Sequence, residues 1–89
     1  MAKTDLVGLP RALLALKTED EMSQFLADIL SHQELDQLEN RWKAFQLILQ
    51  GLPQREVSQA LGLGIATVSR ASRTIQHGNG SIKKLYDQL

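Results

Sequence analysis

The sequence contains no cysteine and only two prolines among its 89 residues. Without cysteine, neither a disulfide framework nor a thiolate metal site can form. The two histidines, His32 and His77, stand far apart and lack the spacing of metal ligands. We therefore expect no metal site.

Long hydrophobic runs are also missing. No apolar stretch approaches the roughly 20 residues that a membrane-spanning helix needs. The first ten residues, MAKTDLVGLP, lack the apolar core and the small-residue cleavage site of a signal peptide. We therefore expect a cytoplasmic protein without a membrane partner.

The net charge is zero, yet the charges are unevenly distributed. Residues 1–50 carry five basic and eight acidic side chains, and residues 51–89 carry five basic and two acidic ones. The two halves therefore differ in sign, at −3 and +3. A basic C-terminal half can meet a polyanion while the acidic half faces elsewhere. An excess this small also arises by chance, so charge alone decides little.

The period of the apolar residues predicts an all-α protein. No strand-like alternation persists, and no hairpin dipeptide occurs. Capping-box sequences at 18–21 and 31–34 open two of the helices, and Gly51 is a natural stop for the longest one. Glycine and asparagine in Gly78-Asn79-Gly80 are expected to supply a positive φ between the last two helices. About six helices are expected, near residues 9–17, 18–30, 31–50, 53–61, 65–77 and 80–88.

The longest predicted helix carries an apolar seam with alternating spacings of three and four residues. A chain this short buries a small fraction of its surface, so the seam favours packing against a second chain. A central core helix in a monomer explains the same pattern, and both interpretations stay open. The seam consists of Leu35, Leu38, Trp42, Phe45 and Leu49.

The stretch GLPQREVSQALGLGIATVSRASR, residues 51–73, contains two glycines that resemble part of a phosphate-binding loop. A dinucleotide fingerprint requires a third glycine where this sequence has Thr67, and a strand where it predicts a helix. The Gly-Lys-Ser/Thr of a Walker loop is absent. We therefore reject a nucleotide site.

The same stretch fits a helix-turn-helix motif. Val57 and Leu61 place apolar side chains one turn apart on the first helix, and Gly62 lies at the turn. The second helix begins with small and polar residues, which suits entry into a major groove of DNA. A plain helical hairpin with solvated arginines is the alternative. The residues expected at the DNA are Gln54, Arg55, Ser58, Ile65, Ala66, Ser69 and Arg73.

In these residues the sequence resembles the Trp repressor family. The resemblance is strongest in QREVSQALGLGIATVSRAS and extends upstream through LENRWKAFQLILQG, which looks like the family's central helix. It implies an intertwined homodimer whose two reading heads enter successive major grooves of a palindromic operator. It also implies L-tryptophan as corepressor.

The resemblance further implies a ligand site between two arginines, which match Arg41 and Arg70. Arginine can stack on an aromatic ring and pair with a carboxylate through two hydrogen bonds. Hydroxyl side chains in the family help to hold the ligand's ammonium group. The implied ligand residues are Leu30, Ser31, Arg41, Thr67, Arg70, Ala71 and Thr74.

The sequence departs from the family pattern in three places. Ala71 stands where the family usually has glycine, Arg73 replaces a neutral polar residue, and the loop GLPQRE is one residue shorter. A methyl group at Ala71 intrudes into a tightly fitted pocket. The effector therefore stays open between L-tryptophan, another small molecule and none.

No nucleophile–base pair or carboxylate cluster for a catalytic metal stands out, so we expect no enzymatic activity. The prediction is one domain, residues 1–89, with dimerisation helices in 1–50, a helix-turn-helix reading head in 51–77 and a C-terminal helix in 78–89. Its expected function is sequence-specific DNA binding as a transcriptional regulator, most simply a repressor of a biosynthetic operon. The alternative is a helical protein-interaction module that keeps the motif as a scaffold.

Overall fold

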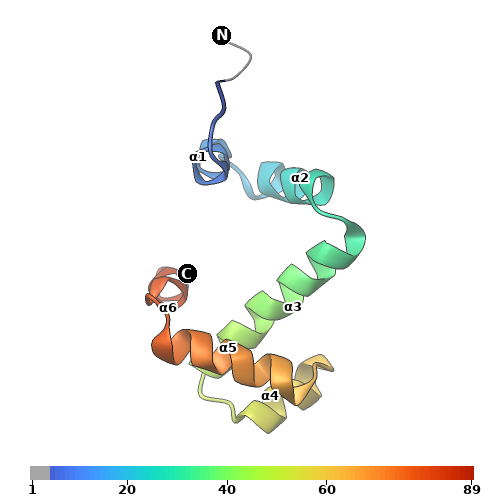
Figure 1. Cartoon of the computed structure of the whole chain (residues 1–89), viewed down its shortest axis with the longest axis vertical. Helices are drawn as coiled ribbons and strands as arrows, with labels where there is room; N and C mark the ends of the chain where they lie inside the picture. The colour runs from blue at the N-terminus through green and yellow to red at the C-terminus, as the bar shows by residue number, and fades with distance from the viewer. Residues whose placement is uncertain (1–4) are drawn as a thin grey trace. The chain divides into compact units, whose positions relative to one another are not determined.

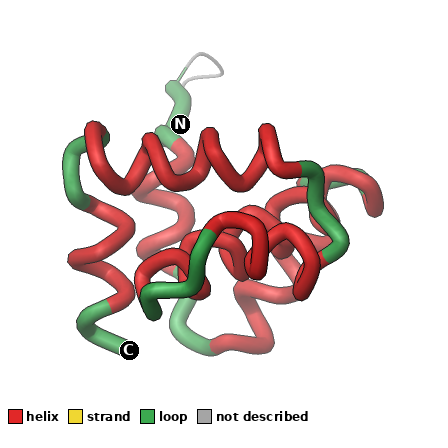
Figure 2. Tube along the Cα trace, turned by 90° about the horizontal axis from the view of Figure 1, so that it is seen from below, coloured by secondary structure: helices red, strands yellow, loops and turns green. Residues whose placement is uncertain are grey.

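The computed structural model describes residues 5–89, and every regular element in this range is an α-helix (Figure 2). This confirms the predicted all-α class with six helices. The first and last helices are shorter than expected by one or two residues at their ends. None of the helices in the described range is both long and apolar enough to cross a membrane. The helices are α1 (Leu9–Ala15), α2 (Glu19–Ile29), α3 (His32–Leu49), α4 (Gln54–Leu61), α5 (Ile65–His77) and α6 (Ser81–Tyr86).

One of the two predicted capping boxes forms in full, and the other forms in part. Thr18 Oγ1 accepts a hydrogen bond from the backbone N–H of Glu21 at 3.0 Å, although the Glu21 carboxylate accepts from Lys17 rather than Thr18. At α3, Ser31 Oγ accepts from the N–H of Glu34 at 3.1 Å, and the Glu34 carboxylate accepts from the N–H of Ser31 at 2.8 Å. Hydrogen bonding to the Glu34 carboxylate, by the backbone N–H of Ser31 first and by the Ser31 side chain second, holds the pKa of Glu34 below its ordinary value.

The chain divides into two compact units, Met1–Leu35 and Asp36–Leu89. In the first unit none of the described residues is buried. The apolar face of α2 is half-buried at Phe25 and Leu26, and Ile29 remains 53% exposed. The predicted division of the chain into dimerisation helices and a reading head stays a prediction.

The second unit holds the buried core. Val57 of α4 and Val68 of α5 are fully buried. The helices α4 and α5 that carry them are in contact (Figure 1). Half-buried apolar side chains of α3, of the α4–α5 turn and of α6 pack around them. This core therefore fixes α4 and α5 against α3. Its buried members are Ala44, Phe45, Val57, Val68 and Ala71.

The seam of α3 is only partly covered within the chain. Phe45 is buried, Trp42 and Leu49 are half-buried, and Leu38 remains 41% exposed. The end of α3 also holds α6: the rings of Trp42 and Tyr86 meet edge to face at 6.5 Å, and Gln50 Nε2 donates to the Tyr86 hydroxyl at 3.1 Å.

Two turns have the glycine geometry that the sequence predicts. Gly51 and Gly62 adopt φ of 92° and 67°, in the left-handed region that end caps favour. At the third turn Gly80 has φ of 81°, but the expectation for Asn79 is wrong, because no non-glycine residue in 5–89 has a positive φ. Asn79 instead accepts a hydrogen bond from the N–H of Ser81 at 3.0 Å through its side chain.

Candidate functional site

The helices α4 and α5 and their short turn make up a helix-turn-helix. Gly62 ends α4 in the left-handed conformation, and the N–H of Leu63 donates to the carbonyl of Ser58 at 3.1 Å. Three residues therefore separate the two helices, and α5 starts at Ile65. Val57 and Val68 face the core, which leaves the start of α5 at the surface.

Most residues predicted to meet DNA are exposed on this motif. Ile65 is 53% exposed, and Ala66 and Arg73 are exposed further along α5. At the start of α4, Gln54 and Arg55 are exposed as well. Exposed arginines can contact phosphates, and a small residue at the start of a helix allows close approach to a groove.

One hydrogen bond joins the two helices at this surface. The hydroxyl of Ser69, a half-buried residue of α5, donates to Oε1 of Gln54 at 2.6 Å. The bond links the first residue of α4 to the middle of α5 across 15 positions of sequence. The sequence assigns both residues to the DNA surface but does not show that they touch each other.

Ser58 has a structural role at the turn. Its side chain is half-buried and its hydroxyl donates to the carbonyl of Leu63. That carbonyl lies at the turn, where a helix end leaves backbone groups unpaired. Ser58 therefore stabilises the turn, and its assignment to the DNA surface stays a prediction.

A cavity of about 400 Å³ opens between α3, α5 and α6. It has an apolar floor with a few polar groups, the usual character of a small-molecule site. Five of the seven residues predicted to bind a ligand line it. The lining comprises Arg41, Ala44, Phe45, Thr67, Arg70, Ala71, Thr74 and Ile82.

Arg41 and Arg70 also line a neighbouring cavity of about 340 Å³. That cavity also shares Thr67, and its remaining lining is more polar, with the amides of Gln37 and Asn40. Arg41 of α3 and Arg70 of α5 therefore border both hollows and stay exposed. Two guanidinium groups in this position can hold an anionic group such as a carboxylate.

The wall on α5 combines a methyl group with a hydroxyl. Ala71 is only 6% exposed, so its methyl group narrows the cavity from a fixed position in the helix. Thr74 donates its hydroxyl proton to the carbonyl of Arg70 at 3.1 Å. The oxygen of that hydroxyl keeps lone pairs and can accept from an ammonium group.

The other two predicted ligand residues lie in the first unit. Leu30 is the C-cap of α2, and the hydroxyl of Ser31 caps α3 by accepting from Glu34. Their assignment to the ligand site stays a prediction.

Three lining residues escaped the sequence reasoning. Ala44 and Phe45 lie three and four positions after Arg41, so helical spacing alone places them on the same face. Ile82 gave no such signal, because its position depends on the turn between α5 and α6.

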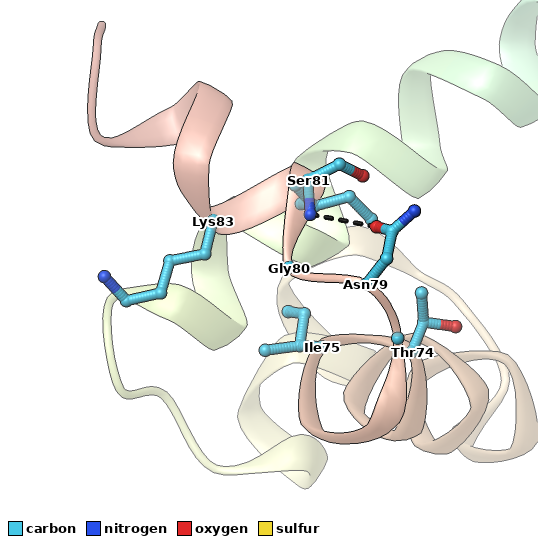
Figure 3. Close-up of a pocket in the computed structure, with 8 residues that line it drawn as sticks. Thr74, Ile75, Asn79, Gly80, Ser81 and Lys83 are labelled. Atoms are coloured by element: carbon cyan, nitrogen blue, oxygen red, sulfur yellow. Dashed lines mark hydrogen bonds between the residues drawn. The ribbon is translucent and has the colours of Figure 1, made fainter.

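That turn borders a third hollow of about 250 Å³ (Figure 3). Thr74 and Ile75 of α5 lie on one side of it, and Gly80 and Ser81 lie on the other. The Asn79 side chain already occupies the N–H of Ser81. Across residues 5–89, no three His, Asp or Glu side chains gather closely enough to hold a metal ion.

Comparison with known proteins identifies the family. The family model described as Trp repressor protein matches residues 5–89. The chain belongs to the Trp repressor family. A crystal structure of a TrpR-like protein from Eubacterium eligens ATCC 27750 is similar, with a TM-score of 0.84 and 25% identity, over 90% of this chain and 82% of that one.

A sequence relative in the Trp repressor family comes from Bacillus subtilis strain 168. It is the uncharacterized protein YerC, 25% identical over 85 residues, which cover 96% of this chain and 82% of YerC. Membership in the family indicates a DNA-binding regulator.

Proposed function

We propose that this chain is a sequence-specific DNA-binding transcriptional regulator that represses a biosynthetic operon. One observation carries the proposal: a helix-turn-helix whose inner side is fixed by fully buried Val57 and Val68 and whose outer side exposes Ile65, Ala66 and Arg73. A rigid helix with a small, exposed N-terminal end can enter a major groove. Family membership supports the same function.

The regulator acts as a homodimer in this proposal. The described part of Met1–Leu35 has no buried residue, and Leu38 and Ile29 expose apolar surface. A segment without a core of its own gains stability only by packing against something else. A second copy of the chain is the partner that the family likeness favours.

The dimer is tested by sedimentation equilibrium at micromolar concentration. The full chain should sediment at twice its mass of 9.9 kDa. Leu38→Asp, which places a charge on the open part of the α3 seam, should shift the population towards monomers. The control Gln59→Asp adds the same charge at an exposed position of α4, outside the segment expected to pack against the second copy. A wild-type chain that sediments as a monomer at every concentration contradicts the dimer.

The effector in this proposal is a small molecule with a carboxylate, held between Arg41 and Arg70 in the cavity of about 400 Å³. L-tryptophan is the first candidate, because the family likeness implies it. A smaller ligand, or no effector, is the second candidate, because the buried methyl group of Ala71 narrows the site. Calorimetry with L-tryptophan separates the two, since the second predicts no heat of binding.

DNA binding is tested by selecting duplexes from a random pool and titrating the enriched sequences at several salt concentrations. The logarithm of affinity should fall linearly with that of salt, by about 0.9 for each phosphate contact. Arg73→Gln should reduce this slope by about one contact. Lys84→Gln removes the same charge from α6 and should leave the slope nearly unchanged. If affinity does not change with salt concentration and no sequence is enriched, the result favours the alternative function, a helical protein-interaction module.

A further inference from the structure

The hydrogen bond between Ser69 and Gln54 fixes how the glutamine amide is oriented. The hydroxyl of Ser69 donates to the amide oxygen of Gln54 at an oxygen–oxygen distance of 2.6 Å, which is typical of an O–H···O bond. The oxygen end of the amide therefore faces α5.

The orientation decides which chemistry remains at the surface. A glutamine amide has one oxygen that accepts and one NH₂ group that donates. Because Oε1 of Gln54 already accepts from Ser69, the NH₂ group, which only donates, is the main part left to meet another molecule. The helices that carry the two residues are in contact, and Val57 and Val68 in them are fully buried, so the pair is held on a rigid base.

We propose that Ser69 is a positioning residue that makes Gln54 a hydrogen-bond donor to an acceptor group on DNA. The inference rests on the proposed DNA-binding function and refines it. Adenine recognition by glutamine uses the amide oxygen and nitrogen side by side, and here the oxygen is directed at Ser69. Guanine presents two acceptors in the major groove, N7 and O6, and the backbone presents phosphate oxygens.

The first test uses a variant that keeps the bond to Ser69 and removes the donors. Gln54→Glu still accepts from the Ser69 hydroxyl but has no NH₂ group, so affinity for the selected duplex should fall about tenfold or more. Gln59→Glu, at another exposed position of α4, introduces the same charge and is the matched control. The inference is overturned if the two variants weaken binding equally.

The second test identifies the acceptor and the role of Ser69. In the selected duplex, each guanine is replaced by 7-deazaguanine, or each phosphate by a methylphosphonate, one at a time. At one position the replacement should lower the affinity of the wild-type chain. The replacement that does so is 7-deazaguanine if guanine is the acceptor, and the methylphosphonate if a phosphate oxygen is the acceptor. Ser69→Ala should be less sensitive to that same replacement, because the amide is free to turn. Ser69→Thr restores a hydroxyl and should recover the wild-type sensitivity.

The outcomes distinguish a failure of the positioning role of Ser69 from a failure of DNA binding. If Ser69→Ala keeps the full sensitivity of the wild-type chain, or if no single replacement affects the wild type, the positioning role is wrong while DNA binding stands. If the wild-type chain enriches no sequence, the proposed function fails and the inference falls with it. Thermal melts of every variant show whether a loss of affinity comes from unfolding.

Discussion

The substitution Ala71→Gly should have opposite effects on the stability and on the ligand affinity of this protein. Ala71 lies inside α5, is 6% exposed and lines the cavity that Arg41 and Arg70 border. The family usually has glycine at this position, so the methyl group of Ala71 is what distinguishes this cavity from the family's ligand site. Removing it widens the cavity next to the two arginines, so L-tryptophan should bind more tightly to the variant than to the wild-type chain.

The loss of stability can be worked out from the position of the residue. Glycine in a helix interior costs about 0.5–1 kcal/mol relative to alanine. A buried methyl group contributes about 0.8 kcal/mol more. For a domain of this size, each kcal/mol lowers Tm by about 4–8 °C. The free variant should therefore melt roughly 5–15 °C below the wild type.

Ligand binding should reverse this loss. A ligand that binds only the folded state adds RT ln(1 + [L]/Kd), which is about 2.7 kcal/mol at a ligand concentration of 100 times Kd. L-tryptophan should therefore raise the Tm of Ala71→Gly by more than it raises that of the wild type. Thermal melts with and without ligand, together with calorimetry, measure both effects in the same samples.

Ala66→Gly is the control for the cost of placing glycine in a helix. Ala66 is exposed on the same helix and does not line the cavity. Its replacement should lower Tm by the glycine term alone and leave ligand binding as in the wild type. The steric argument is refuted if the wild type and Ala71→Gly bind L-tryptophan with equal affinity, or if neither binds it.

Four further substitutions, one of them a control, test the turns and the cap. Gly62→Ala should destabilise the fold by about 1–2 kcal/mol in a denaturant titration, because an L-residue is strained at φ of 67°. Gly64→Ala is the control and should be nearly neutral in the same titration, because φ is −64° there. Gly78→Ala should lower Tm, because its Cβ would collide with the backbone carbonyl of Thr74; an unchanged melt would contradict that close approach. Glu34→Gln should lower Tm at pH 7. The pKa of Glu34 is lower in the folded chain than its ordinary value of 4.5, so the ionised carboxylate stabilises the fold at pH values above 4.5. This stabilisation is lost as the pH falls below 4.5 and the carboxylate becomes protonated. The Tm difference between Glu34→Gln and wild type should therefore shrink by pH 3, and a difference that is constant with pH would show that the charge has no part in the cap.

The elements that the sequence predicts well are those set by local chemistry. The capping box of Ser31 and Glu34 uses residues three positions apart, and the structure contains both of its hydrogen bonds. Gly62 marks a turn because glycine alone reaches the left-handed region without strain. Such signals depend on neighbours in sequence, so no knowledge of the fold is needed to interpret them.

The features that escaped prediction depend on how the turns are built. Ile82 lines the main cavity only because the turn before α6 brings it back towards α3 and α5. Ser58 is assigned to the DNA surface from its place on the motif, and the bond that its hydroxyl makes to the carbonyl of Leu63 was not predicted. Asn79 has a side-chain hydrogen bond where a left-handed backbone was expected. A residue type indicates which bonds are available, while the fold decides which of them forms.

The helix α5 connects the proposed DNA surface with the proposed effector site. Thr67, Arg70 and Thr74 recur every three or four residues and line the cavity, so they share one stripe of the helix. The residues expected at the DNA, among them Ser69 and Arg73, recur at the same period on a neighbouring stripe. A ligand can change DNA affinity only if it binds one arrangement of the head better than another.

A carboxylate held by both arginines would tie α5 to α3, because Arg41 and Arg70 come from different helices. We therefore expect a regulating ligand to act by fixing the angle at which α5 meets the groove. Linkage then requires that DNA raise the affinity for the ligand by the same factor by which the ligand raises the affinity for DNA. Calorimetric titration of the ligand into the free protein and into its DNA complex measures that factor. Equal affinities in the two titrations would mean that the cavity and the reading head are independent.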